Sequence, residues 1–293
     1  MHVHSYFSGR CTTRFLSRIC RESYNHPDEV YERLRERGMT LFTLTDHDSI
    51  EGAETLLRRP NFFVSEEVTC HMPSGAEVHI GVFDITERKH IEIQRRRDDL
   101  PSLLAYFSEN RVLFCVNHVF SSLTGRRAEE DFAWFRERFP AVEARNGHLL
   151  KKQNAAAARF ARNSAKIALG GSDAHAMASV GATYTEVPGA QTKEEFFAGL
   201  HSRMGRACGE SGSHWKLTRD VLMIVSELIR EERWMVLFSP LAALVPIVTF
   251  ANYAKERHFL RHWSTKVLGE PEIIRKDSWI RGLQGEAEEW TWP

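Results

Sequence analysis

Short β-prone apolar runs alternate with helix-like runs over residues 1–210, and this alternation most limits what the chain can fold into. After the opening residues 1–4, the strand-like runs are 41–45, 62–64, 78–83, 112–116, 141–144 and 167–169. Helix-like segments separate most of them, at 27–37, 101–108, 128–138 and 149–162. Such an alternation is typical of βα units around a parallel sheet, so we expect an α/β fold with about seven strands.

The side chains that end these runs are of the types that bind metal ions. The chain opens Met1-His2-Val3-His4, and a strand points residues i and i+2 to the same face, so both imidazoles can reach one ion. Later runs end in further candidates, namely Asp46, His47, Glu67, His79, His118, Asp173 and His175. In a βα barrel the functional residues gather at the C-terminal strand ends. The sequence therefore predicts a metal centre that several strands share.

Two adjacent acids, Glu66 and Glu67, are both candidates for this centre. On a strand, neighbouring residues face opposite ways, so only one of the two carboxylates can join it. We predict that Glu67 is the ligand.

In this order, the motifs resemble the PHP (polymerase and histidinol phosphatase) family of metal-dependent phosphoesterases over about residues 1–210. The elements are His2-Val3-His4-Ser5, Thr45-Asp46-His47-Asp48-Ser49-Ile50, Glu67, His79, Asn117-His118 and Gly171-Ser172-Asp173-Ala174-His175. The resemblance implies a distorted (β/α)7 barrel that holds two or three divalent ions. It also implies hydrolysis of phosphoric esters.

The resemblance further implies a role for each ligand. His2, His4, Glu67 and Asp173 would hold a first ion, Glu67 would bridge to a second with His79 and His118, and His47 and His175 would hold a third. Imidazoles suit Mn, Fe or Zn better than Mg or Ca. A metal ion or His175 would assist the leaving oxygen, and Asp46 is a ligand or, more plausibly, orients a metal-bound histidine.

Two departures from the family pattern stand near the N-terminus. Many members carry an Asp or His shortly after the first motif to complete the third metal site, whereas this chain reads Tyr6-Phe7-Ser8-Gly9-Arg10. The third ion is therefore weaker, absent, or completed by another group such as Asp46 or Asp48. Only Met1 precedes His2, so either the first strand is clipped or the start lies further upstream.

The leading functional hypothesis is hydrolysis of a phosphate monoester or diester of a small molecule, such as a nucleotide or sugar phosphate. Hydroxide activated by the metal ions would attack phosphorus. Arg10, Arg145 and Asn146 lie on loops or strand ends at the expected active face, and we predict that they bind the substrate.

Two other functions remain open. A nuclease acting on single-stranded nucleic acid is not favoured, because 39 basic residues balance 39 acidic ones and Arg95-Arg96-Arg97 is followed at once by Asp98-Asp99. The other alternative is a metal-stabilised scaffold without catalytic activity. Five scattered cysteines without a CxxC motif fit a reducing compartment, so we expect a cytoplasmic protein.

The alternation stops near residues 208–213, a small polar stretch that reads as a linker, and residues 213–293 are expected to form a small helical extension. Within it, residues 234–254 contain no charged side chain and are long enough to span a bilayer. Pro240 and Pro246 weigh against a span. We favour burial against the barrel or a homo-oligomer contact, with membrane association as the alternative.

Overall fold

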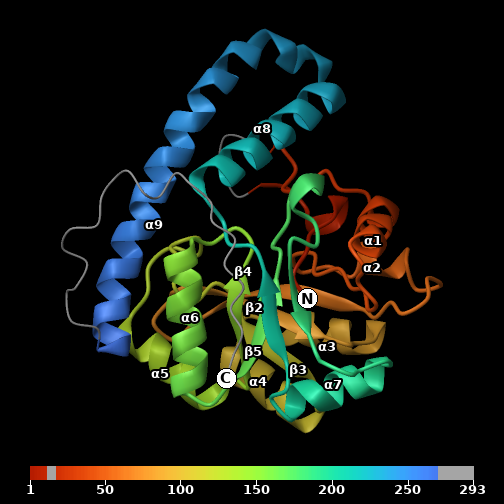
Figure 1. Cartoon of the computed structure of the whole chain (residues 1–293), viewed down its shortest axis with the longest axis vertical. Helices are drawn as coiled ribbons and strands as arrows, with labels where there is room; N and C mark the ends of the chain where they lie inside the picture. Colours follow the sequence, from red (N-terminus) through yellow and green to blue (C-terminus); the bar gives the residue numbers. More distant parts are fainter. Residues whose placement is uncertain (12–17, 270–293) are drawn as a thin grey trace.

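The computed structural model describes residues 1–11 and 18–269, and its centre is a five-stranded sheet (Figure 1). In spatial order, the strands are β1 (Ser65–His71), β2 (Glu77–Phe83), β3 (Leu113–Val116), β4 (Ala141–Asn146) and β5 (Ile167–Gly171). The α/β fold class is confirmed. The sheet is mixed, however, because β2 runs antiparallel to both β1 and β3, and only β3–β4 and β4–β5 are parallel.

This mixture corrects the expectation of a parallel sheet. The connection between β1 and β2 runs only over residues 72–76, and a parallel pair needs a crossover of a dozen or more residues. The two strands therefore form a hairpin, with Met72 N donating to Ala76 O at 2.7 Å.

Three predicted strand segments form single bridges or short extensions rather than ladders of their own. Val3 pairs with Ala174, Phe42 with Phe62, and His47 with Glu67. Thr45 N also donates to Val3 O at 2.9 Å. Among the described residues, the continuous ladders make one five-stranded sheet and one two-stranded sheet, so they do not by themselves close a barrel.

Helices surround the five-stranded sheet (Figure 1). They are α1 (Pro27–Glu36), α2 (Glu51–Glu54), α3 (Glu87–Arg96), α4 (Leu100–Glu109), α5 (Glu129–Arg138), α6 (Lys151–Asn163) and α7 (Lys193–His201). The four helices predicted from sequence are confirmed as α1, α4, α5 and α6. The small antiparallel sheet of β6 (Thr183–Glu186) and β7 (Arg206–Gly209) was not predicted. Short 3₁₀ turns, η1 (Tyr6–Ser8) and η2 (Met177–Ser179), complete this part of the chain.

Beyond β7, the chain forms two long helices joined by a 3₁₀ helix. Helix α8 (His214–Glu231) leaves the body, the 3₁₀ helix η3 (Arg233–Leu244) crosses over, and α9 (Val245–Leu268) returns along α5 and α6 (Figure 1). The returning half of α9 packs well, since the ring of Trp263 lies 5.0 Å from that of Phe132 in the main core.

The uncharged segment 234–254, called the arch below, covers most of η3 and the first ten residues of α9, and it is not packed against the α/β body. Within Arg233–Leu268, the most apolar 18-residue window is only 11% buried. Our expectation of burial against the barrel is therefore wrong for this segment. By length and composition alone, Arg233–Leu268 could cross a membrane. Residues 270–293, the end of the predicted extension, lie outside the described residues.

Candidate metal centre

Four side chains from three segments bring one ligand atom each to a common point. His2 Nε2 lies 3.0 Å from His4 Nε2, 3.1 Å from Glu67 Oε2 and 3.4 Å from Asp173 Oδ1. His4 Nε2 is 3.3 Å from each of the two carboxylate oxygens. Tetrahedral ligands about 2.0–2.1 Å from one ion lie about 3.3 Å apart, so this donor set fits one transition-metal ion.

The other ring nitrogens of these histidines are held by partners that aim the free nitrogens inward. His2 Nδ1 lies 2.7 Å from Glu143 Oε1, and His4 Nδ1 lies 2.9 Å from Ser8 Oγ. Metal-ligating histidines commonly donate their second N–H to such a partner, which selects the tautomer and the ring orientation. The first donor group, defined by His2, His4, Glu67 and Asp173, therefore has both the ligands and the supports of a metal site.

Glu67 connects this group to a second one. Its Oε2 faces His2 and His4, whereas its Oε1 lies 3.5 Å from His79 Nδ1 and 3.4 Å from His118 Nε2. Asn117 Nδ2 donates to the same Oε1 at 2.7 Å and so fixes the carboxylate. The strand parity argument holds, because Glu66 points the other way and accepts hydrogen bonds from His90 and Gln94.

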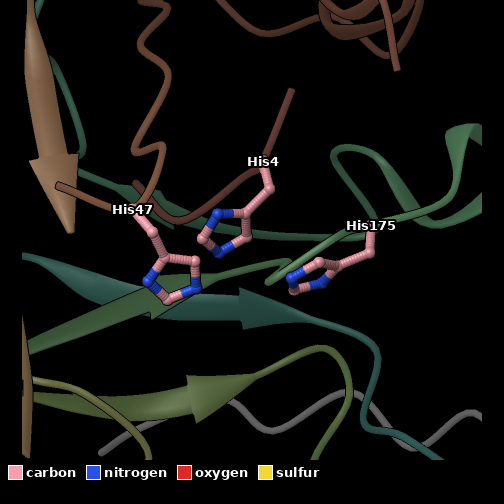
Figure 2. A group of neighbouring side chains, drawn as sticks. All are labelled: His4, His47 and His175. Atoms are coloured by element: carbon pink, nitrogen blue, oxygen red, sulfur yellow. The ribbon is translucent and has the colours of Figure 1, made fainter. Parts of the chain in front are cut away.

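A third group forms at the site for which residues 6–10 supply no carboxylate or imidazole. Figure 2 shows His4, His47 and His175 gathered together, with the ring of His4 4.7 Å from that of His47 and 4.3 Å from that of His175. Glu22 Oε1 lies 3.5 Å from both His47 Nε2 and His175 Nε2.

Glu22 was missed in the sequence because it follows no strand and matches no motif. Neither Asp46 nor Asp48 takes its place. Asp46 accepts from Ser5 N and Ser8 Oγ, and Asp48 accepts from Thr69 N and pairs with Arg97.

The carboxylates and imidazoles of the cluster shift one another's pKa values in favour of their charged forms. Burial alone would raise the pKa of Glu67, but His2 and His47 hold it well below its usual range. Burial would lower the pKa of His79, yet Glu67 and Glu77 raise it to about 10. In the same way, Glu22 and Asp173 raise the pKa of His175 to about 9 against the effect of burial. The site thus attracts positive charge, whether protons or metal ions.

Two further observations fit a metal centre. His175 Nδ1 donates to the backbone carbonyl of Asp173 at 3.0 Å, and its buried Nε2 has no hydrogen-bond partner among the described residues. His118 and Asp173 both adopt positive φ, at 33° and 49°. Positive φ is uncommon for non-glycine residues, and two of the eight described residues that adopt it lie in this cluster.

Close backbone approach brings the first segment into the cluster. Asp173 N donates to His2 O at 2.8 Å, and a Cβ at Gly171 would lie 2.1 Å from His2 Cβ. Only glycine at position 171 therefore lets the segment that carries His2 and His4 lie beside β5.

An irregularity in β4 adds two residues that sequence parity would place on opposite faces. The register shifts between Glu143 and Arg145, so that Glu143 and Asn146 both point into the cluster. Asn146 Nδ2 donates to Glu143 Oε2 and to Asp173 Oδ2, each at 2.9 Å. Asn146, predicted to bind substrate, thus lies in the centre, while Glu143 was missed.

The remaining predicted site residues lie further from the donor atoms. The Asp46 carboxylate accepts from Ser8 Oγ, which in turn contacts His4 Nδ1, so Asp46 lies one hydrogen-bonded partner away from the donor atoms. Arg145 donates to the carbonyl of Gly209, and the exposed Arg10 donates to the carbonyl of Arg18, so neither side chain is directed into the cluster. Their predicted contacts with substrate stay predictions.

His148 is a histidine of the cluster that the sequence analysis did not predict. It lies beside Asp173 and His175, and its Nε2 is 3.2 Å from Asp220 Oδ2 on α8. Its ring stacks on that of His175 at 5.8 Å. No strand-end pattern pointed to it, because the residue follows β4 by two positions in a loop.

The fold and the site together define an α/β protein with a cluster of buried histidines and carboxylates that could hold metal ions. A sequence family described as PHP-associated matches residues 151–204, a stretch that contains Asp173 and His175. The predicted resemblance to PHP proteins is confirmed at this level. A search of curated proteins finds no match.

Solved structures give a distant likeness in fold. PsfC from Pseudomonas syringae matches with a TM-score of 0.50 and 16% identity, over 69% of this chain and 88% of that one. An amidohydrolase from Chromobacterium violaceum, solved with bound sulfate and no metal, matches with a TM-score of 0.46 and 16% identity, over 70% of this chain and 96% of that one. A lesion-specific endonuclease from Pyrococcus furiosus matches with a TM-score of 0.47 and 16% identity, over 69% of this chain and 55% of that one.

Proposed function

We propose that this chain is a metal-dependent phosphoesterase that hydrolyses phosphate monoesters of small molecules. The observation that carries the proposal is the placement of Glu67, whose two carboxylate oxygens face two different groups of histidine nitrogens. A carboxylate in this position can hold two ions together. Paired divalent ions activate water and neutralise the charge on a phosphoryl group.

Three ions of the Mn, Fe or Zn type fit the donors present. The first would be held by His2, His4, Glu67 and Asp173, the second by Glu67, His79 and His118, and the third by His47, His175 and Glu22. Glu22 supplies the carboxylate that the residues after the first motif lack.

Phosphate charge leads us to place monoesters before diesters. A phosphate monoester carries about −1.5 to −2 at neutral pH, whereas a diester carries about −1. Divalent ions therefore attract the monoester more strongly.

The chain's own residues prepare the site for proton transfer. His175 Nδ1 donates to the Asp173 carbonyl, and its Nε2 lies 3.5 Å from Glu22 Oε1, where we place the third ion. As a ligand of that ion, His175 would have no ring nitrogen left for the leaving group. His148, held by Asp220, lies beside the same group, and we assign to it the proton for the leaving oxygen.

We also propose the predicted division into a barrel over residues 1–210 and a helical extension that begins at residue 213, of which the structure describes the part up to residue 269. The bridges at Val3, Phe42 and His47 support a ring of seven segments, since they link the end of β5 through the first two segments to β1. We propose that this ring corresponds to the distorted (β/α)7 barrel expected from the PHP resemblance.

The test combines metal analysis with a substrate panel. Protein purified with Mn or Fe should contain two to three ions per chain and release phosphate from monoesters such as p-nitrophenyl phosphate. Faster cleavage of bis(p-nitrophenyl) phosphate or of labelled single-stranded oligonucleotide would instead favour the diester or nuclease alternative. Metal-loaded protein that cleaves none of these would contradict the proposal.

A further inference from the structure

The arch between α8 and α9 exposes an unusual amount of apolar surface. Nine large hydrophobic side chains between Trp234 and Phe250 are 48–78% exposed, with Leu237 the most exposed. The other exposed large hydrophobic residues of the described chain are scattered, apart from Trp215 and Leu222 on α8. A contiguous apolar patch of this kind marks an interaction surface.

The few polar groups near the base of the arch are turned inward. Thr249 is buried, and its Oγ1 lies 2.7 Å from Thr218 Oγ1 and 3.2 Å from His214 Nε2. Meanwhile, Ile247 and Val248, the two residues just before it, are 66% and 64% exposed. The polar side chains thus lie between the helices and the apolar ones lie outside. This arrangement is expected in lipid rather than in water.

Both ends of the uncharged segment are tied to the same body. Before it, Glu231 Oε1 pairs with Arg21 Nε at 3.1 Å. After it, the buried Glu256 accepts from Ser122 N at 3.1 Å and from Gln153 Nε2 at 2.6 Å. A membrane span would put these ends on opposite sides and break the buried contacts of Glu256. The segment can therefore enter a bilayer only from one side and return.

The borders of the segment match a lipid headgroup layer. Trp234 and Tyr253 stand at its two ends, where interfacial aromatics are enriched. The adjacent basic side chains are Arg233, Lys255 and Arg257, together with Arg230, which pairs with Glu227 at 2.7 Å. Of the neighbouring acids, Glu231 is paired with Arg21, Glu232 accepts from Trp234 Nε1 at 2.9 Å, and Glu256 is buried against Ser122 and Gln153. Basic flanks of this kind are attracted to anionic lipids.

We propose that the arch, residues 234–254, is a one-sided membrane anchor that inserts into the headgroup and upper acyl region of an anionic bilayer. Pro240 and Pro246 suit this arrangement, because they interrupt a straight transmembrane helix. Between α8 and Pro246 lies an open groove of about 440 Å³ with an apolar wall that includes Trp215, Leu222 and Met223, which extends the apolar surface.

Helix α8 connects the anchor to the metal centre. Its Asp220 contacts His148, and its Glu231 pairs with Arg21, the neighbour of Glu22. The 18 residues of α8 are about 27 Å long, so docking holds the centre within about that distance of the bilayer.

The experiment is co-sedimentation of the full chain with vesicles of phosphatidylcholine and phosphatidylglycerol, without added substrate. Wild-type protein should bind these vesicles, and bind vesicles of phosphatidylcholine alone more weakly. Leu237→Glu should weaken binding about tenfold or more, because it puts a charge where an apolar side chain enters the bilayer. Leu57→Glu is the matched control, since Leu57 is 60% exposed on another part of the molecule, and it should bind like wild type.

Folding and oligomeric state are measured on the same samples. Both variants should keep the wild-type circular dichroism and melting temperature, and Val248→Glu should repeat the effect of Leu237→Glu. A wild-type chain that ignores both kinds of vesicle would overturn the proposal. A stable lipid-free dimer that Leu237→Glu dissociates would also overturn it, by identifying the arch as a contact between copies of the chain.

Discussion

The candidate metal centre and the arch depart from the usual distribution of side chains in opposite directions. In the centre, histidines and carboxylates such as His4 and Glu67 are almost completely buried. In the arch, side chains such as Leu237 and Ile247 are mostly exposed. Burying a charge costs free energy unless an opposite charge lies beside it, and exposing apolar surface to water costs free energy unless another apolar surface covers it. We propose that cations supply the opposite charge in the donor cluster and that lipid covers the apolar surface of the arch.

The two regions also differ in how they are built. The centre joins residues from segments that lie far apart in the sequence, such as His2 and Asp173, and it needs the whole body to hold them. The arch is one continuous segment that makes few contacts with the body. Substitutions should thus affect chemistry in the first region and association in the second.

The largest effect is expected when the bridge between the first two donor groups is removed. Glu67→Gln keeps the shape of the side chain but loses the negative charge that two ions would share. We expect activity to fall about a thousandfold and at least one ion per chain to be lost. Phosphate release and metal content are the two measurements.

Glu66→Gln provides the matched control for that change. Glu66 is equally buried but faces His90 and Gln94, and burial raises its pKa toward the neutral form that glutamine imitates. Equal losses of metal in both variants would contradict the assignment of Glu67 as the bridge.

A second comparison separates the two halves of α9. Trp263 lies in the core against Phe132, so Trp263→Ala should lower the free energy of unfolding by about 3–5 kcal/mol. Ile247→Ser, on the exposed half, should change it by no more than about 0.5 kcal/mol. Denaturant titration measures both. A large loss for Ile247→Ser would show that the arch is packed in solution, against our proposal.

The third prediction concerns Glu22. If it completes the third donor group, Glu22→Gln should reduce the metal content by about one ion and lower activity about thirtyfold. Asp48→Asn tests the alternative raised by the sequence, and we expect it to keep the full metal content because Asp48 is bonded to Thr69 and Arg97. The opposite pattern would restore Asp48 as the ligand.

The smallest catalytic effect is expected at Glu143, which orients His2. Glu143→Gln weakens a charge-assisted contact without removing a ligand, so metal affinity should fall about tenfold. Arg145→Gln, two residues further along β4, should change metal affinity less than about twofold, because Arg145 is bonded to Gly209 on the other side of the bulge. Competition with a chelator measures both affinities. Similar values for the two variants would show that Glu143 does not act through the metal.

The sequence by itself determined the features that depend on local periodicity. Strand parity placed His2 and His4 on one face and separated Glu67 from Glu66, and the predicted helices at α1, α4, α5 and α6 formed where expected. The apolar character of residues 234–254 was also evident, since composition does not depend on folding. These features follow from backbone geometry over a few residues, which is the same in every fold.

Only the tertiary structure decided the rest. Glu22 joins His47 and His175 from a loop that no motif marks, and the bulge in β4 turns Glu143 and Asn146 to the same side. Likewise, whether residues 234–254 are buried depends on where α8 and α9 leave the body, and the structure leaves them exposed. Contacts between distant segments and the exposure of a surface are properties of the whole packed chain, so no local pattern carries them.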